Sequence, residues 1–360
     1  MKKWIPILGV FCISMILLGC NKSGFKGEIA IYLDDLAAKD SFSGVVLVAR
    51  DGKPILEKAY GWANRDHEIP NQVDTKFNLG SMNKMFTAIA VLQLAQQGKL
   101  AMDDTIVEHL PDYPNREVAG QVTIHHLLTH TSGLGDFFTA EFLEISKDRF
   151  RTLNDYLPLF VDQPLQFEPG SQGSYSNAGY IVLGLIIEEI TGQSYFDYVR
   201  ENIYQPCGMA NTDSYETDKV VPNIATGYSR LMSKDGSVSS NVFFNPAKGS
   251  SAGGGYSTAE DMLNFSNCLM NHQFLNLELT DVLLEGKVDS PNLGDGAEYG
   301  YGFGVRMMNS HHIVGHGGGA PGVCSNLDIF LDLGYTVVIL SNSDYDCHPV
   351  KTRIRETLLE

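Results

Sequence analysis

The feature that most constrains the fold is the placement of strand patterns at both ends of the chain. Residues 43–61 contain two β-rich runs joined by an Asp51-Gly52 turn, which is typical of a β-hairpin. A second pair of runs, 323–331 and 335–341, lies near the C-terminal end, and helix patterns fill the sequence between the two pairs. We therefore predict an α+β fold: an antiparallel sheet built from N- and C-terminal segments and flanked by helices, with an inserted, mainly helical lobe.

Two helices of the middle region can be placed from the sequence. Residues 84–97 carry apolar side chains at helical spacing and end at Gly98, a common helix stop. Residues 178–190 are apolar over most of their length, which is typical of a buried helix, and Gly192 follows them. Residues 232–251 are rich in glycine, serine and asparagine, so we expect a surface loop there that borders a cleft.

The first twenty residues have the character of a targeting segment. Two lysines begin the chain, an apolar run covers residues 7–18, and Cys20 follows a Leu-Leu-Gly sequence. The run is too short for a comfortable membrane span. It resembles a bacterial lipoprotein signal, in which residues 1–19 are removed, Cys20 carries the lipid and residues 20–30 form a polar tether. An ordinary signal peptide with a chance cysteine is the alternative. The first interpretation predicts an exported cell-envelope protein that reaches the membrane only through Cys20.

The charge balance narrows the range of partners. Lys and Arg number 26 against 43 Asp and Glu, so the formal net charge is −17. An acidic chain without a basic stripe is a poor candidate for binding nucleic acid or anionic lipid. Ten histidines are present, but no carboxylate or cysteine joins them at a known metal-ligand spacing. We expect a small-molecule or peptide substrate and neither a metal nor an organic cofactor.

Four cysteines lie beyond the targeting segment. They are widely spaced and form no Cys-x-x-Cys pair: Cys207, Cys268, Cys324 and Cys347. An exported protein is free to form disulfides, but the spacing does not give a pairing. We interpret each of them as a small buried hydrophobic side chain.

The strongest chemical signal is a serine three residues before a lysine, Ser81 and Lys84, in the stretch NLGSMNKMFT. This spacing places both side chains on one face of the predicted helix. A serine at a helix start is commonly an N-cap. The alternative is a nucleophile whose proton is taken by a lysine with a lowered pKa. The same spacing recurs at Ser23 and Lys26 without any partner motif, so spacing alone does not decide.

Two further stretches would complete a site. Tyr175 and Asn177 lie two residues apart, just before the buried helix, so they point the same way in an extended segment. His316 follows a strand pattern and precedes the glycines Gly317 to Gly319, which weaken a strand unless another group approaches its backbone. Each stretch alone has a structural explanation, as a buried tyrosine or a glycine bulge. Together, and in this order, they indicate catalysis.

In this combination the sequence resembles the serine β-lactamase and penicillin-binding-protein-like family, specifically its class C-like branch. That branch includes class C β-lactamases, D-alanyl-D-alanine peptidases and β-lactamase-related esterases. The resemblance covers about residues 31–360 and rests on FNLGSMNKMFTA, LLTHTSGL, FEPGSQGSYSNAGYIVLG, GMANT, SAGGGYSTAEDM and GHGGGAPG. It implies one catalytic domain of β-lactamase/transpeptidase-like fold, with a sheet lobe (about 31–75 and 285–360) and a helical lobe (about 76–284).

The resemblance implies a role for each matched residue. Ser81 would be the acylated nucleophile, Lys84 its proton acceptor, and Tyr175 the partner base and proton shuttle. The backbone N–H groups of Ser81 and Gly319 would form the oxyanion hole. The implied substrate-binding residues are Asn177, His316 and Gly318. We expect His130, within LLTHTSGL, to be a packed and hydrogen-bonded residue.

Position 316 departs from the family pattern. Many β-lactamases and peptidases have the lysine of a Lys-Thr-Gly strand there, which offers a permanent charge to a substrate carboxylate. Histidine is mostly neutral at pH 7, and Gly317 lacks the threonine hydroxyl. We therefore expect a serine hydrolase that forms an acyl-enzyme on ester or amide substrates, of the esterase or D-amino-acid peptidase type, with weak β-lactam hydrolysis. The alternatives are a class C-like β-lactamase proper and a non-catalytic envelope protein that binds a ligand or peptidoglycan.

Overall fold

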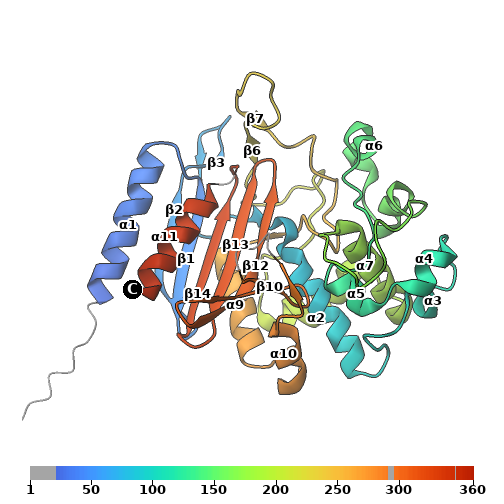
Figure 1. The fold of residues 1–360 in the computed structure, drawn as a ribbon. Coiled ribbons are helices and arrows are strands. Elements are labelled where there is room, and N and C mark those ends of the chain that lie inside the picture. The colour runs from blue at the N-terminus through green and yellow to red at the C-terminus, as the bar shows by residue number, and fades with distance from the viewer. Residues whose placement is uncertain (1–21, 291–295, 345) are drawn as a thin grey trace, which may run out of the picture.

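A computed structural model describes residues 22–290, 296–344 and 346–360, and it confirms the predicted α+β fold (Figure 1). Its main element is an antiparallel sheet with the strand order β2-β1-β14-β13-β12-β11-β10-β9. The strands of this sheet are β1 (Gly44–Arg50), β2 (Lys53–Tyr60), β9 (Val288–Asp289), β10 (Glu298–Tyr299), β11 (Gly304–Met308), β12 (His311–Ala320), β13 (Val323–Phe330) and β14 (Tyr335–Ser341). The N-terminal hairpin therefore pairs directly with the last strand of the chain.

Most helices lie between β5 and β9 in the sequence and form the region beside the sheet (Figure 1). The α-helices are α1 (Lys22–Ala38), α2 (Asn83–Gln96), α3 (Ile106–His109), α4 (Arg116–Gln121), α5 (Ile124–Leu128), α6 (Ala140–Glu144), α7 (Asn177–Thr191), α8 (Tyr195–Val199), α9 (Ala259–Met270), α10 (Leu277–Leu284) and α11 (Cys347–Leu359). Short helical turns are η1 (Gly80–Met82), η2 (Lys147–Arg149), η3 (Leu153–Leu159), η4 (Arg200–Tyr204) and η5 (Gln205–Cys207). Short strand pairs join β3 (Trp62–Asn64) to β4 (Ile69–Pro70), β5 (Phe77–Asn78) to β8 (Tyr256–Ser257) and β6 (Tyr228–Ser229) to β7 (Ser239–Ser240).

Different helices bury the two faces of the sheet. Helices α1 and α11 cover one face, where Val46 lies opposite Ile339 (Figure 1). The other face packs against the helical region through Val45, which lies opposite Leu340. Because successive side chains of a strand point to opposite faces, both sets of positions must be apolar. This explains why β1 and β14 read as continuous apolar runs.

The prediction of a polar tether over residues 20–30 was wrong from residue 22 onwards, where α1 begins. Phe25, Ile29 and Leu33 recur every four residues and give α1 an apolar stripe. Ile29 and Leu33 are fully buried in the layer between the sheet and α11. The burial of this stripe, rather than the polar residues around it, decides the structure of the segment.

The predicted signal peptide at residues 1–19 and the predicted lipid attachment site, Cys20, lie outside the described residues. The second Ser-x-x-Lys sequence, at residues 23–26, lies on α1. Among the residues that the structure describes, no helix combines the length and apolar character needed to cross a bilayer.

The four cysteines form two disulfides, so their interpretation as free buried side chains was wrong. Cys207 is bonded to Cys268, which ties η5 to α9. Cys324 is bonded to Cys347, which ties β13 to the start of α11. The partners are 61 and 23 residues apart, so only the folded chain brings them together.

Candidate active site

Ser81 lies in η1, the helical turn that leads into α2. The preceding Gly80 has a φ of +51°, a left-handed conformation that favours glycine. A Cβ atom at Gly80 would also lie 2.9 Å from the backbone nitrogen of Gly319 on β12. The N-cap positions of η1 and α2 are Leu79 and Met82, so Ser81 is not the helix cap. The turn instead holds Ser81 between α2 and the edge of β12.

Lys84 is fully buried on the first turn of α2. Its Nζ lies 3.3 Å from Ser81 Oγ, 2.7 Å from Asn177 Oδ1 and 2.6 Å from the carbonyl oxygen of Ala252. Burial lowers the pKa of Lys84 from 10.5 to about 7, and the charge of Asp136 opposes this shift. A large share of Lys84 is therefore neutral at pH 7 and able to accept a proton.

The contacts of Lys84 determine where its lone pair points. The oxygens of Asn177 and Ala252 are acceptors only, so they take the two N–H bonds of the neutral amine. The lone pair then faces Ser81 Oγ and is placed to accept a hydrogen bond from its hydroxyl. After proton transfer, the ammonium can donate to all three oxygens. One arrangement of side chains therefore suits both protonation states of Lys84.

Tyr175 and Asn177 flank the start of α7. The Nδ2 of Asn177 donates to Asp136 Oδ2 at 2.8 Å, which turns the amide oxygen towards Lys84. The Tyr175 ring centroid lies 4.8 Å from Lys84 Nζ, although 42% of the tyrosine side chain is exposed. Packing around the hydroxyl raises the pKa of Tyr175, while a hydrogen bond with Ser81 lowers it. Tyr175 is therefore a neutral hydroxyl at rest.

The hydrogen-bonding direction along β12 points the N–H of Gly319 towards the serine. Leu331 N donates to the oxygen of His312, so the backbone N–H and C=O groups of the even-numbered residues of β12 point towards β13. The backbone groups of the odd-numbered residues point to the opposite edge of β12, which β11 covers only as far as Gly315. Gly319 lies beyond that point, on the side of η1 and Ser81. Its backbone N–H therefore points to the side on which η1 holds Ser81.

Gly318 marks the closest approach between β12 and the serine loop. A Cβ atom there would lie 2.0 Å from the oxygen of Leu79 and 2.4 Å from Ser325 Oγ, so no side chain fits. This is the close backbone approach that the glycine run predicts. The resemblance implied substrate binding by Gly318, whereas in the structure it packs against Leu79 and its neighbour Gly319 lines the adjacent cavity.

His316 offers no positive charge to a substrate at neutral pH. Desolvation of the ring, together with the charge of Lys84, lowers the pKa of His316 from 6.5 to about 3. Its Nδ1 faces the carbonyl oxygen of Gly317, so that nitrogen carries the proton. Its Nε2 then accepts a hydrogen bond from the Tyr299 hydroxyl at 2.9 Å. The neutral state agrees with the expectation from the sequence.

The structure adds three residues that were not predicted: Asp136, Ala252 and Tyr299. Asp136 comes two residues after the LLTHTSGL stretch, and this position is the signal that could have identified it. Ala252 lies in the SAGGGYSTAEDM stretch but acts through its carbonyl group, which no side-chain pattern reveals, and Tyr299 comes from a two-residue strand without a motif. His130 is packed as expected, since it is buried, accepts a backbone N–H and stacks on Tyr175 with ring centroids 4.2 Å apart.

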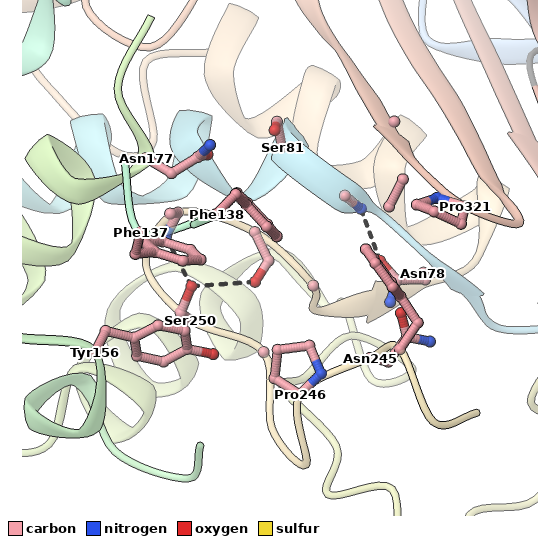
Figure 2. Close-up of a pocket in the computed structure, with 18 of the residues that line it drawn as sticks. Asn78, Ser81, Phe137, Phe138, Tyr156, Asn177, Asn245, Pro246, Ser250 and Pro321 are labelled. Atoms are coloured by element: carbon pink, nitrogen blue, oxygen red, sulfur yellow. Dashed lines mark hydrogen bonds between the residues drawn. The ribbon is translucent and has the colours of Figure 1, made fainter. Parts of the chain in front are cut away.

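A cavity of about 370 Å³ opens beside Ser81. Figure 2 shows Ser81 and Asn177 at one side of it and the rings of Phe137, Phe138 and Tyr156 along its wall. No charged side chain is among the described residues that line it. Part of the lining comes from the predicted surface loop, which confirms that this loop borders a cleft: Phe244, Asn245, Pro246, Gly249 and Ser250.

A second cavity, of about 310 Å³, lies on the other side of Ser81 and Tyr175. It passes His316 and reaches the face of the sheet that α11 covers. Arg306 and Lys351 contribute cationic side chains to it. Its remaining lining residues are Tyr299, Gly304, Gly315, Gly317, Asn326, Asp328 and His348. The serine therefore stands between an uncharged, aromatic cavity and a charged one.

Comparison with known proteins places this geometry in context. A model of the Beta-lactamase family matches residues 31–359. Penicillin-binding protein 4* of Bacillus subtilis (strain 168) is 29% identical over 341 residues, which cover 90% of this chain and 73% of that protein. The crystal structure of a penicillin binding protein from Bacillus halodurans has a TM-score of 0.82 at 35% identity, covering 90% of this chain and 98% of that one. The D-amino acid amidase from Ochrobactrum anthropi SV3 has a TM-score of 0.78 at 26% identity, covering 93% of this chain and 98% of that one.

Proposed function

Because this chain belongs to the Beta-lactamase family, we propose that it is a serine hydrolase that acts on esters or amides through an acyl-enzyme. The observation that carries the proposal is the contact between Lys84 Nζ and Ser81 Oγ at 3.3 Å, with the lysine fully buried. A buried amine of lowered pKa beside a hydroxyl is the arrangement that activates a nucleophile. The amidase among the similar structures supports hydrolysis as the reaction class.

Acylation begins when neutral Lys84 takes the proton of the Ser81 hydroxyl. Ser81 Oγ forms a bond to the substrate carbonyl carbon, and the carbonyl oxygen becomes an oxyanion held by the N–H groups of Ser81 and Gly319. Each such donor typically contributes roughly 3 kcal/mol of transition-state stabilisation. The proton then passes from Lys84 through Tyr175 to the leaving group as its bond to carbon breaks. Water then forms a bond to the acyl carbon and gives up a proton to the Tyr175–Lys84 pair; the bond to Ser81 Oγ breaks, and the serine takes that proton back as the acid is released.

The two cavities suggest what the substrate carries on each side of the scissile bond. The aromatic wall of the first cavity suits an uncharged, apolar group. The second cavity holds the cationic side chains of Arg306 and Lys351 against one carboxylate, Asp328, so its charge balance suits a group with negative charge. Within the proposed activity, these cations favour D-amino-acid peptides or β-lactams over neutral esters, and the substrate carboxylate would lie there rather than against His316.

An activity-based probe tests the proposal directly. Wild type and Ser81→Ala are incubated with a fluorophosphonate and with a fluorescent penicillin, and intact mass is measured. We expect one covalent adduct on wild type and none on Ser81→Ala. An unlabelled wild type, or equal labelling of both proteins, contradicts the proposal. Reversible binding of the penicillin without an adduct would favour the non-catalytic alternative.

A matched pair of variants separates the two candidate substrate classes. Lys351→Gln removes one cation of the second cavity, and Lys99→Gln removes an exposed lysine outside both cavities. If substrates carry a carboxylate, Lys351→Gln raises KM for a D-alanyl dipeptide or nitrocefin but not for a neutral ester. Equal KM changes for all three substrates would favour the esterase assignment.

We propose further that the protein is exported and anchored through Cys20. The two disulfides support this proposal, because disulfides persist mainly in oxidising compartments. Metabolic labelling with a palmitate analogue in a bacterial host tests it. Label in wild type that disappears in Cys20→Ala is the expected result, and equal label, or none, in both proteins contradicts it.

A further inference from the structure

The carboxylate of Asp136 joins three parts of the site. Its Oδ2 accepts hydrogen bonds from the backbone nitrogen of Asn177 at 3.2 Å and from the amide Nδ2 of the same residue at 2.8 Å. Its Oδ1 accepts from the backbone nitrogen of Phe138 at 3.2 Å. Asn177 in turn accepts from Lys84 Nζ at 2.7 Å. A continuous chain of hydrogen bonds therefore runs from Asp136 through Asn177 to Lys84 and on to Ser81.

An asparagine side chain alone does not determine which end of its amide faces a neighbour. If the amide of Asn177 turned over, its NH₂ group would face Lys84, and the lysine lone pair would accept that proton instead of the proton of Ser81. Asp136 prevents this, because a carboxylate accepts hydrogen bonds and has no proton to donate. The carboxylate of Asp136 therefore fixes the donor-to-acceptor direction of every hydrogen bond between Asp136 and Ser81.

We propose that Asp136 is a positioning residue for the Ser81–Lys84 pair: it holds the oxygen of Asn177 towards Lys84 and places a negative charge behind the ammonium formed when Lys84 takes the serine proton. This inference rests on the proposed function, which requires that proton transfer. Asp136 does not contact the reacting atoms and acts through Asn177. Its position at the N-terminus of α7 also favours a negative charge.

Asp136 supplies the charge that balances the ammonium. The titratable groups that surround Lys84, besides Ser81, are Asp136, His130, His316, Tyr175 and Tyr180. Burial lowers the pKa of both histidines and raises the pKa of both tyrosines, so these four are neutral at pH 7. Among the described residues around Lys84, the carboxylate of Asp136 is thus the charged group that favours the protonated amine.

Three variants separate charge from geometry. Asp136→Asn removes the charge but keeps an oxygen for Asn177, whereas Asp136→Ala removes both. Glu141→Gln removes a nearby exposed carboxylate that lies outside the chain of hydrogen bonds, and serves as the control. The rate of Ser81 acylation by a fluorophosphonate is measured from pH 5 to 9 for each protein, with melting temperature as a check on folding.

We expect the acid limb of the profile to move to lower pH by about one unit in Asp136→Asn, because a charge roughly two hydrogen bonds away stabilises the ammonium by that order. The plateau rate should fall about threefold, since a less basic amine is a weaker general base. The plateau rate should be lower still in Asp136→Ala, and the profile of Glu141→Gln should match that of wild type. An unmoved acid limb in Asp136→Asn, or an equal shift in Glu141→Gln, overturns the inference.

A second measurement does not depend on catalysis. NMR titration of ¹³C-labelled lysine side chains follows Lys84 directly, assigned by its loss in Lys84→Met. We expect a lower pKa of Lys84 in Asp136→Asn than in wild type, and an unchanged or higher value overturns the inference. If wild type is not acylated at Ser81 but this shift is present, the proposed function fails while the effect of the Asp136 charge on Lys84 stands.

Discussion

The hydroxyl of Tyr299 lies 2.9 Å from Nε2 of His316 and donates a hydrogen bond to it, because the carbonyl oxygen of Gly317 fixes the proton on Nδ1. The Nδ1 nitrogen carries the proton and faces a backbone carbonyl, so both ring nitrogens are used. The pKa of His316 is lowered to about 3, so the ring stays neutral across the physiological pH range. The pH dependence of the site is therefore set by Lys84 rather than by His316.

We predict that acylation rises with pH through about 7. Lys84 has a pKa of about 7 and must be neutral to accept the serine proton, so the rate should fall about tenfold for each pH unit well below that value. The measurement is kcat/KM for a short ester between pH 5 and 9. His316→Gln, which is also neutral, should keep the same inflection. A flat profile over this range would contradict the assignment of Lys84 as the base.

The buried amine also predicts a pH-dependent stability. The unfolded chain keeps the Lys84 proton up to about pH 10.5, whereas the native protein keeps it only up to about pH 7. Between these values the unfolded state binds more protons, so this group makes the native state more stable as pH rises, by about 1.4 kcal/mol per pH unit. Comparison of Lys84→Met with wild type by urea unfolding at pH 7 and pH 9 isolates the effect. From pH 7 to pH 9 the free energy of unfolding should increase more for wild type than for Lys84→Met.

Gly318 should not tolerate a side chain, whereas Gly317 should. A Cβ atom at Gly318 would lie 2.0 Å from the oxygen of Leu79, while at Gly317 the nearest atom is at 3.5 Å. We expect Gly318→Ala to lower the free energy of unfolding by roughly 1–3 kcal/mol or more. Gly317→Ala should change it by less than about 0.5 kcal/mol. Urea unfolding compares them, and equal effects would show that β12 can move away from the serine loop.

The aromatic cavity predicts a preference for large acyl groups. Phe138 lines the cavity and is half exposed, so its removal should leave the fold intact. Phe138→Ala should lower kcat/KM about tenfold for an aromatic acyl ester relative to an acetyl ester, because contact with one large apolar group contributes roughly 1–3 kcal/mol. Leu143→Ala, on an exposed side chain outside the cavity, is the control. An unchanged ratio of the two esters in Phe138→Ala would show that the acyl group lies elsewhere.

Reduction of the disulfides should destabilise the protein. Cys324–Cys347 closes a loop of 23 residues and Cys207–Cys268 closes one of 61, so each cross-link restricts the unfolded chain. We expect the double variant Cys324→Ser with Cys347→Ser to lower the free energy of unfolding by about 2–4 kcal/mol. Denaturant unfolding of this double variant, compared with wild type plus and minus dithiothreitol, measures the contribution. A reductant that lowers the stability of wild type no more than that of the double variant would contradict it.

The sequence by itself determined the fold class and supplied the candidate site residues. Apolar runs at both ends and helical patterns between them indicate the type of each element, and that information is local. The serine, lysine, tyrosine and glycine-rich stretches could be identified only in combination, since each of them alone also has a structural explanation. Helix α1 was missed because its apolar stripe consists of few side chains, Phe25, Ile29 and Leu33. The sheet that buries this stripe is built partly from residues far along the chain.

Only the tertiary structure decided how these residues work together. The lowered pKa of Lys84 comes from burial by segments as distant as Ala252, and the hydrogen-bond chain to it comes from Asp136 and Asn177. The disulfide partners and the cations of the second cavity are likewise brought together by the fold. Desolvation and hydrogen-bond direction depend on what surrounds an atom in space, and sequence spacing does not specify those surroundings.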